Sequence, residues 1–194
     1  MKFIRTIYDK TMKLSQGQGA MFALFAVAFA ESSFFPIPPD IMLIPMILAA
    51  PSKAWRIAGL ATIASVLGGY FGYAIGVFFF DLIAEPLLSF YGYLQKFHQF
   101  EEYYHEYGAW IVFGAGLTPF PYKIITIASG VVHLNLGVFS VASVLARGGR
   151  FFIVAWLLKK YGAPMKIFIE KNLGWLSVVF FALLIGGFAL IKLL

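Results

Sequence analysis

Hydrophobic and polar positions along this chain fall into long blocks rather than a short alternation. A membrane-crossing helix needs about 20 predominantly apolar residues. Three blocks meet that length without interruption, at residues 57–80, 136–158 and 173–191. Two further blocks, 20–50 and 108–134, are comparably apolar but are broken by prolines. The pattern predicts one all-α integral membrane domain, residues 1–194, with about three transmembrane helices.

Prolines divide each broken block near its middle. Proline lacks a backbone N–H and clashes with the preceding helical turn, so each break ends a helix. The resulting half-helices of about 10 to 15 residues are too short to cross a membrane alone. We therefore predict two re-entrant helical hairpins, 20–50 and 108–134, with breaks at Pro36, Pro38 and Pro39 and at Pro119 and Pro121. Such irregular backbone needs protein or a water-filled cavity around it.

The two broken blocks read as copies of one unit. Pro36 and Pro119 are 83 residues apart, and the helices that follow share an Ala-Ser-Val-Leu sequence, at 64–67 and 142–145. With one crossing per unit, the second copy enters the membrane from the opposite side. The prediction is an inverted repeat, an arrangement in which transporters place their sites at the midplane.

Charged residues between the blocks orient this scheme. Residues 2–16 read as an amphipathic helix on the membrane surface, and 81–107 as an interfacial linker. One side of the membrane would carry ten Lys or Arg and two acids, whereas the other would carry two Lys and five acids. Positive charge favours the cytoplasmic side, so we expect a cytoplasmic N-terminus.

Composition agrees with a lipid environment. The chain is 61% hydrophobic and 12% charged, whereas a soluble domain is about one quarter charged. The net charge is +6, but the basic residues are scattered among apolar blocks, so nucleic acid is not an expected partner. Anionic membrane lipid is the expected partner. A homo-oligomer is compatible with the sequence.

Five ionisable residues remain at membrane depth, and each carries an insertion cost of at least about 2.5–3.5 kcal/mol. Glu31 and Asp40 are the candidate proton-coupling residues. Two structural alternatives stay open. Asp40 could simply cap the half-helix that it begins, and Glu31 could form a structural ion pair with Arg147 or Arg150.

The basic residues at membrane depth point to a phosphate. Lys123 begins a half-helix, where a cation opposes the helix dipole and calls for an anionic partner. Arg147 and Arg150 are three residues apart and share one helix face. Together these three cations are the candidate phosphate-binding residues. Gly68, Gly72 and Gly76, spaced at four, are instead expected to serve close helix packing.

Catalytic and metal chemistry is not expected. The chain has no cysteine, no G-x-S-x-G elbow and no H-E-x-x-H sequence. Glu102 and His105 form one E-x-x-H, but a di-metal bundle needs a second copy. We expect no enzyme activity, cofactor or metal.

Several motifs, in order, resemble the DedA family, also called the VTT or SNARE-associated membrane family, and most closely its proline-rich YqaA-like branch. They are Phe29-x-Glu31, the Pro-x-Pro-Pro-Asp segment ending at Asp40, the glycine-rich stretch 68–76, Thr118-Pro-Phe-Pro-Tyr-Lys123, and Arg147-Gly-Gly-Arg150. The resemblance runs from about residue 20 to 190. One departure stands out, because the earlier basic position of the family's second hairpin is Leu117, which cannot bind phosphate.

The resemblance implies a fold with two opposed re-entrant hairpins and movement of lipids between leaflets. We expect a flippase or scramblase in a bacterial-type inner membrane. Its substrate would be undecaprenyl phosphate or a phospholipid, and the transport could be driven by protons. Two alternatives stay open: a proton-coupled transporter of a small solute or ion, and a membrane assembly factor with no transport cycle.

Overall fold

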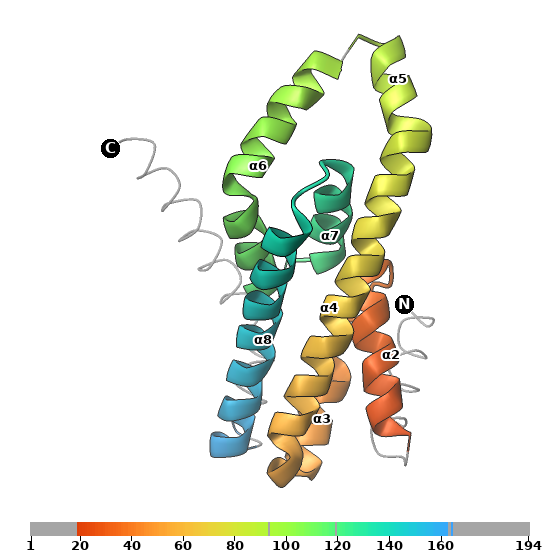
Figure 1. Ribbon diagram of the computed structural model, residues 1–194. Coiled ribbons are helices and arrows are strands. Elements are labelled where there is room, and N and C mark those ends of the chain that lie inside the picture. The colour runs from red at the N-terminus through yellow and green to blue at the C-terminus, as the bar shows by residue number, and fades with distance from the viewer. Residues whose placement is uncertain (1–18, 93, 119, 163, 165–194) are drawn as a thin grey trace, which may run out of the picture.

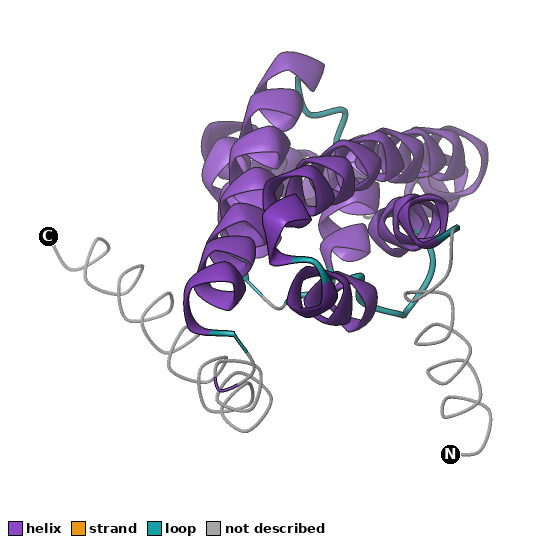
Figure 2. Cartoon of the chain, turned by 90° about the horizontal axis from the view of Figure 1, so that it is seen from below, coloured by secondary structure: helices purple, strands orange, loops and turns teal. Residues whose placement is uncertain are grey.

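Helices make up the regular structure in the described part of the chain, residues 19–92, 94–118, 120–162 and 164, of a computed structural model (Figures 1 and 2). Their order is α2 (Ala20–Ser33), α3 (Asp40–Ala49), the 3₁₀ turn η1 (Pro51–Lys53), α4 (Ala54–Phe79), the π-helical turn η2 (Phe80–Ala84), α5 (Glu85–Phe90), α6 (Leu94–Leu117), α7 (Tyr122–Val131) and α8 (Leu136–Tyr161). The predicted surface helix 2–16 and span 173–191 lie outside the described residues.

Two of the described helices are long and apolar enough to cross a membrane, Pro51–Leu82 and Leu136–Tyr161. They contain the predicted spans 57–80 and 136–158. In Figure 1 they run side by side as α4 and α8, with the shorter helices around them. An all-helical membrane protein is therefore the architecture that the structure supports.

Both proline-rich breaks separate helices. The first lies between α2 and α3, where Pro39 occupies the N-cap position of α3. The second lies between α6 and α7, where Pro121 precedes α7 in an extended conformation. The intact helices α2, α3 and α7 have 14, 10 and 10 residues. At 1.5 Å per residue each is too short to cross a bilayer alone.

The predicted boundary between the linker 81–107 and the second hairpin 108–134 falls inside a helix. Helix α6 continues without a break from Leu94 to Leu117. No proline falls inside α6, and its glycines leave the helix intact. A change from polar to apolar residues along α6 therefore marks no structural boundary.

The packing of α4 depends on its glycines. A Cβ added at Gly68 would collide with the carbonyl oxygen of Phe29 on α2, and one at Gly76 with that of Ile127 on α7. Between them, a Cβ at Gly72 would collide with the hydroxyl of Thr126 on α7. The three glycines therefore let α4 pack closely against α2 and α7, one helix from each proline-broken pair.

Two apolar clusters lie at different heights along α8. One gathers side chains of α2, α3 and α4 with Phe151, Ala155 and Leu158 of α8. The other gathers side chains of α6 and α7 with Phe139 and Ala142 of α8. The segment of α8 between them carries both arginines, so these charges lie between two apolar cores.

We predict that Gly76→Ala lowers the free energy of unfolding by about 1–3 kcal/mol, because the added methyl group meets backbone atoms that cannot move aside. Gly59→Ala is the matched control on the same helix, since an added Cβ there has no atom within 4 Å. The control should leave stability unchanged or raise it by up to about 1 kcal/mol. Thermal unfolding in detergent measures both, and equal midpoints for the two variants would contradict the packing argument.

Candidate functional site

Glu31 and Arg147 form a buried ion pair between α2 and α8. Arg147 Nη2 donates to Glu31 Oε2 over 2.8 Å, and the two side chains are 1% and 13% exposed. Glu31 lies in the last turn of α2, beside carbonyls that have no helical partner. An anion is unfavourable there, and the guanidinium compensates for it.

Two serine hydroxyls close this pair into a ring of hydrogen bonds. Arg147 Nε donates to Ser65 Oγ on α4 over 2.6 Å, and the hydroxyls of Ser65 and Ser32 are 2.6 Å apart. Ser32 Oγ in turn donates to Glu31 Oε2 over 3.2 Å. Because the hydroxyl hydrogen of Ser32 is donated to the Glu31 carboxylate, the hydroxyl of Ser65 must be the donor in its bond to Ser32. The direction of every bond in the ring is thereby fixed, with Glu31 as its acceptor.

Arg150 joins the two proline breaks. Its Nη2 donates to Asp40 Oδ2 over 2.6 Å, and its Nη1 donates to the carbonyl of Thr118 over 2.7 Å. Asp40 is the first residue of α3, and Thr118 directly follows α6. An acid suits the first position and a cation suits the second, because each opposes the charge of its helix end. One guanidinium thus hydrogen-bonds at the start of α3 and at the end of α6, one helix from each proline-broken pair.

Aromatic rings enclose the Arg147 guanidinium. Its central carbon lies 4.9 Å from the ring centre of Tyr122 on α7 and 4.7 Å from that of Phe151 on α8. The Tyr122 hydroxyl donates to Ser143 on α8. Arg147 Nη1 is buried, and it has no hydrogen-bond acceptor among the described residues. Leaving a buried donor without an acceptor costs about 1–3 kcal/mol of stability, so an acceptor oxygen placed at this atom would be favourable.

Lys123 stands apart from these contacts. It is the second residue of α7, next to Tyr122, and is partly buried. Within the described residues it makes no ion pair, and only its backbone carbonyl is engaged, accepting from Thr126 Oγ1 over 3.0 Å. Its charge at a helix N-terminus is therefore uncompensated by the protein groups described.

Four of the five ionisable residues singled out in the sequence are thus brought together in two acid–arginine pairs. Sequence reasoning missed the polar residues that hold them: Ser32, Ser65, Tyr122 and Ser143. A signal for two of these was present, since Ser65 and Ser143 occupy the same place in the repeated Ala-Ser-Val-Leu sequence. Each accepts a hydrogen bond from a residue of the cluster, Arg147 and Tyr122 respectively.

The two pairs differ in access. Arg150 and Asp40 are 18% and 19% exposed, against 1% for Arg147. A ligand can reach Arg150 with small side-chain movements, whereas it reaches Arg147 only through the partly exposed Glu31 or by parting the helices. Guanidinium groups placed in this way can bind an anion with two oxygens. Among the described residues, no group of three or more His, Cys, Asp or Glu side chains is placed to hold a metal ion.

Comparison with known proteins identifies one domain family and two similar proteins. Residues 37–160 match the VTT domain. An uncharacterized protein of Haemophilus influenzae is 39% identical over 183 residues, covering 92% of this chain and 94% of its own. An uncharacterized protein of Histophilus somni is 41% identical over 189 residues, covering 95% of this chain and 97% of its own. No solved structure matches the chain significantly.

We predict that Glu31→Gln lowers the free energy of unfolding by about 3–5 kcal/mol, because it leaves the Arg147 charge buried without its counter-ion. Asp40→Asn should lower it by only about 1–3 kcal/mol, since that pair is more exposed. The exposed Glu102 on α6 provides the control variant Glu102→Gln, with no expected change. Unfolding midpoints in detergent rank the three variants, and a larger loss for Asp40→Asn than for Glu31→Gln would contradict the assigned burial.

Proposed function

Since the chain belongs to the VTT-domain family of DedA-type membrane proteins, we propose that it moves a lipid with a phosphate headgroup between leaflets. The substrate is undecaprenyl phosphate or a phospholipid, and protons drive the movement. The observation that carries the proposal is the pairing of both hairpin carboxylates, Glu31 and Asp40, with both arginines of α8.

A carboxylate and a phosphate compete for the same guanidinium, because both present two oxygens to its planar N–H groups. Protonation of Asp40 removes the charge that holds Arg150 and frees that arginine for a headgroup. Release of the proton restores the pair and expels the headgroup. Glu31 and Arg147 can pass through the same exchange, and the unpaired Nη1 of Arg147 supplies a donor.

Charge balance favours an anionic substrate. The candidate residues comprise three cations, Lys123, Arg147 and Arg150, and two acids, Glu31 and Asp40. With all five ionised, the set carries one net positive charge, which corresponds to Lys123. One negative charge from a phosphate headgroup would neutralise it, and a neutral set is favoured at membrane depth. A soluble cation would instead increase the imbalance.

The proposal includes a membrane arrangement. The proline-broken helix pairs form re-entrant hairpins of opposite orientation, and the protein lies in a bacterial-type inner membrane with its N-terminus in the cytoplasm. The Ala-Ser-Val-Leu repeat and the uneven distribution of basic residues support this arrangement. The lipid tail stays in the bilayer, so the site shelters only the headgroup.

One observation favours a second candidate function. Both arginines already have protein partners, as they would in a membrane assembly factor whose buried charges only hold helices together. In that case the ion pairs are structural and need no proton exchange. A transporter of a small anionic solute would use the same groups, and lipid and soluble phosphate are separated by the assay below.

We predict that Lys123→Ala abolishes leaflet exchange of a fluorescent phosphate-headgroup lipid in liposomes while leaving the unfolding midpoint unchanged. Lys123 makes no ion pair among the described residues, so its removal should not weaken the fold. Arg56→Ala, an exposed residue of α4 with no described ion pair, is the control and should keep exchange. Wild-type exchange should require a proton gradient, and gradient-independent exchange would indicate a scramblase instead. Uptake of soluble phosphate without lipid exchange would indicate a solute transporter.

A charge exchange separates transport from scaffolding. We predict that Glu31→Arg combined with Arg147→Glu regains much of the stability lost in either single variant but not lipid exchange, because the acid then lies on α8 and the cation on α2. A purely structural pair tolerates the swap in both respects. Recovery of full exchange in the double variant would therefore indicate a passive, structural role for this pair, whereas a wild type that exchanges no lipid would favour the assembly factor.

A further inference from the structure

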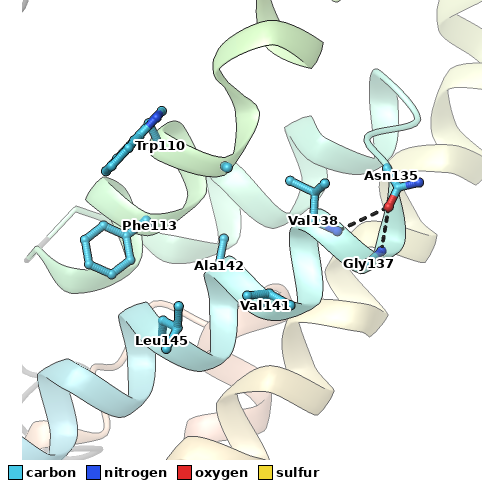
Figure 3. Close-up of a pocket in the computed structure, with 9 residues that line it drawn as sticks. Trp110, Phe113, Asn135, Gly137, Val138, Val141, Ala142 and Leu145 are labelled. Atoms are coloured by element: carbon cyan, nitrogen blue, oxygen red, sulfur yellow. Dashed lines mark hydrogen bonds between the residues drawn. The ribbon is translucent and has the colours of Figure 1, made fainter.

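An apolar groove lies between α6 and α8, on the flank of the bundle. Figure 3 shows the side chains that line it, with Trp110 and Phe113 on α6 facing Val138, Val141, Ala142 and Leu145 on α8. Its volume is about 750 Å³. Trp110, Val141 and Leu145 are more than half exposed, so the groove is open along its side.

Two closely packed glycines of α6 flank the residues that line the groove. At one end a Cβ on Gly108 would collide with Leu134, and at the other a Cβ on Gly116 would collide with Ala146. The two glycines are eight positions apart along α6, a length of about 12 Å. The groove is therefore short, and buried Ala142 is one of the residues that line it.

The polar atoms at the groove are already used. The side-chain oxygen of Asn135 accepts hydrogen bonds from the backbone N–H groups of Gly137 and Val138, at 2.9 and 3.2 Å, and so caps α8 (Figure 3). The remaining lining side chains are hydrocarbon or aromatic apart from the indole N–H of Trp110. The groove thus favours an apolar occupant and offers little to a polar one.

One end of the groove adjoins the charge cluster, which is formed by the two ion pairs Glu31–Arg147 and Asp40–Arg150. Gly116 faces both Ala146 and the ring of Tyr122, the same ring that covers the Arg147 guanidinium. A molecule with a phosphate at the cluster and a hydrocarbon chain attached to it would therefore find an apolar path beginning beside its headgroup.

We propose that this groove binds a segment of the hydrocarbon chain of a lipid whose phosphate is held at the charge cluster. The inference rests on the proposed function and adds to it a second point of recognition, for the chain rather than the headgroup. The protein then binds the lipid both at its headgroup and at the adjoining part of its hydrocarbon chain. It would select for chains that fit the groove.

The test uses a phosphate-headgroup lipid with a photoactivatable diazirine in its chain, in phosphatidylcholine liposomes containing the full chain. We expect labelling of α6 and α8 around residues 109–113 and 138–145, which excess unlabelled lipid suppresses. Val141→Trp should cut this labelling about tenfold, the effect of losing the burial of about two methylene groups. Val144→Trp is the matched control, since Val144 is exposed on the same helix but does not line the groove.

Three results would overturn the proposal. Labelling that excess lipid does not suppress, and that extends equally to exposed Ile63 on α4, would mean ordinary boundary lipid. The chain has no cysteine, so a cysteine at Val138 can be paired with single cysteines placed along residues 176–190. An intrachain disulfide would assign the groove to that segment, and a disulfide between copies would assign it to a dimer contact.

Leaflet exchange separates this proposal from the proposed function. If Val141→Trp exchanges lipid as well as the wild type and labelling persists, the groove proposal fails and the transport proposal stands. If the wild type exchanges no lipid, the transport proposal fails, and saturable labelling still shows whether the groove binds a chain. The unfolding midpoint of Val141→Trp, compared with that of Val144→Trp, shows that the variant is folded.

Discussion

The two ion pairs that join the first hairpin to α8 are the constraint on which the rest of the structure depends. Glu31 and Asp40 lie on either side of the first proline break, and their partners Arg147 and Arg150 lie 116 and 110 residues further along the chain. In an apolar surrounding neither charge can be left alone, so the position of α8 relative to α2 and α3 is fixed by these bonds. The same arginines contact Thr118 and Tyr122 of the second hairpin. Any change in the charge of an acid therefore acts on both hairpins at once.

The short polar side chains of this network need helices that approach closely. Ser65 reaches both Ser32 and Arg147 because α4 lies against α2, and that contact depends on Gly68, one turn further along α4. Gly72 places Thr126 of α7 against the same region, where its hydroxyl donates to the carbonyl of Ser32 over 2.9 Å. The close packing at Gly68 and Gly72 and the charged cluster therefore depend on each other. Larger residues at these two positions would move the serines away from the charged side chains that they hydrogen-bond.

The sequence was sufficient to predict the long apolar helices and the proline breaks between the shorter ones, because these follow from hydropathy and proline chemistry acting locally. It did not predict which acid meets which arginine. Arg147 and Arg150 share one helix face, so either could serve Glu31 by spacing alone, and the choice depends on how α4 and α8 are rotated against the hairpins. Nor did it predict α6 as one helix, because polarity changes at residue 108 while the backbone there meets no proline. Ser65 was not predicted because the candidate residues were chosen by their charge, and a serine in an apolar helix is uncharged.

The unequal burial of the two pairs gives them different roles. Arg147 is enclosed by two rings, a serine and Glu31, and it is reached only after its surroundings move. Arg150 is partly exposed and binds a carboxylate and a carbonyl that belong to different hairpins. Under the proposed function, a phosphate arriving from the membrane would meet Arg150 first, and by displacing Asp40 or Thr118 it would loosen one proline-broken helix pair from α8. Headgroup binding and helix movement would then be the same event, which a transporter requires and a static scaffold does not.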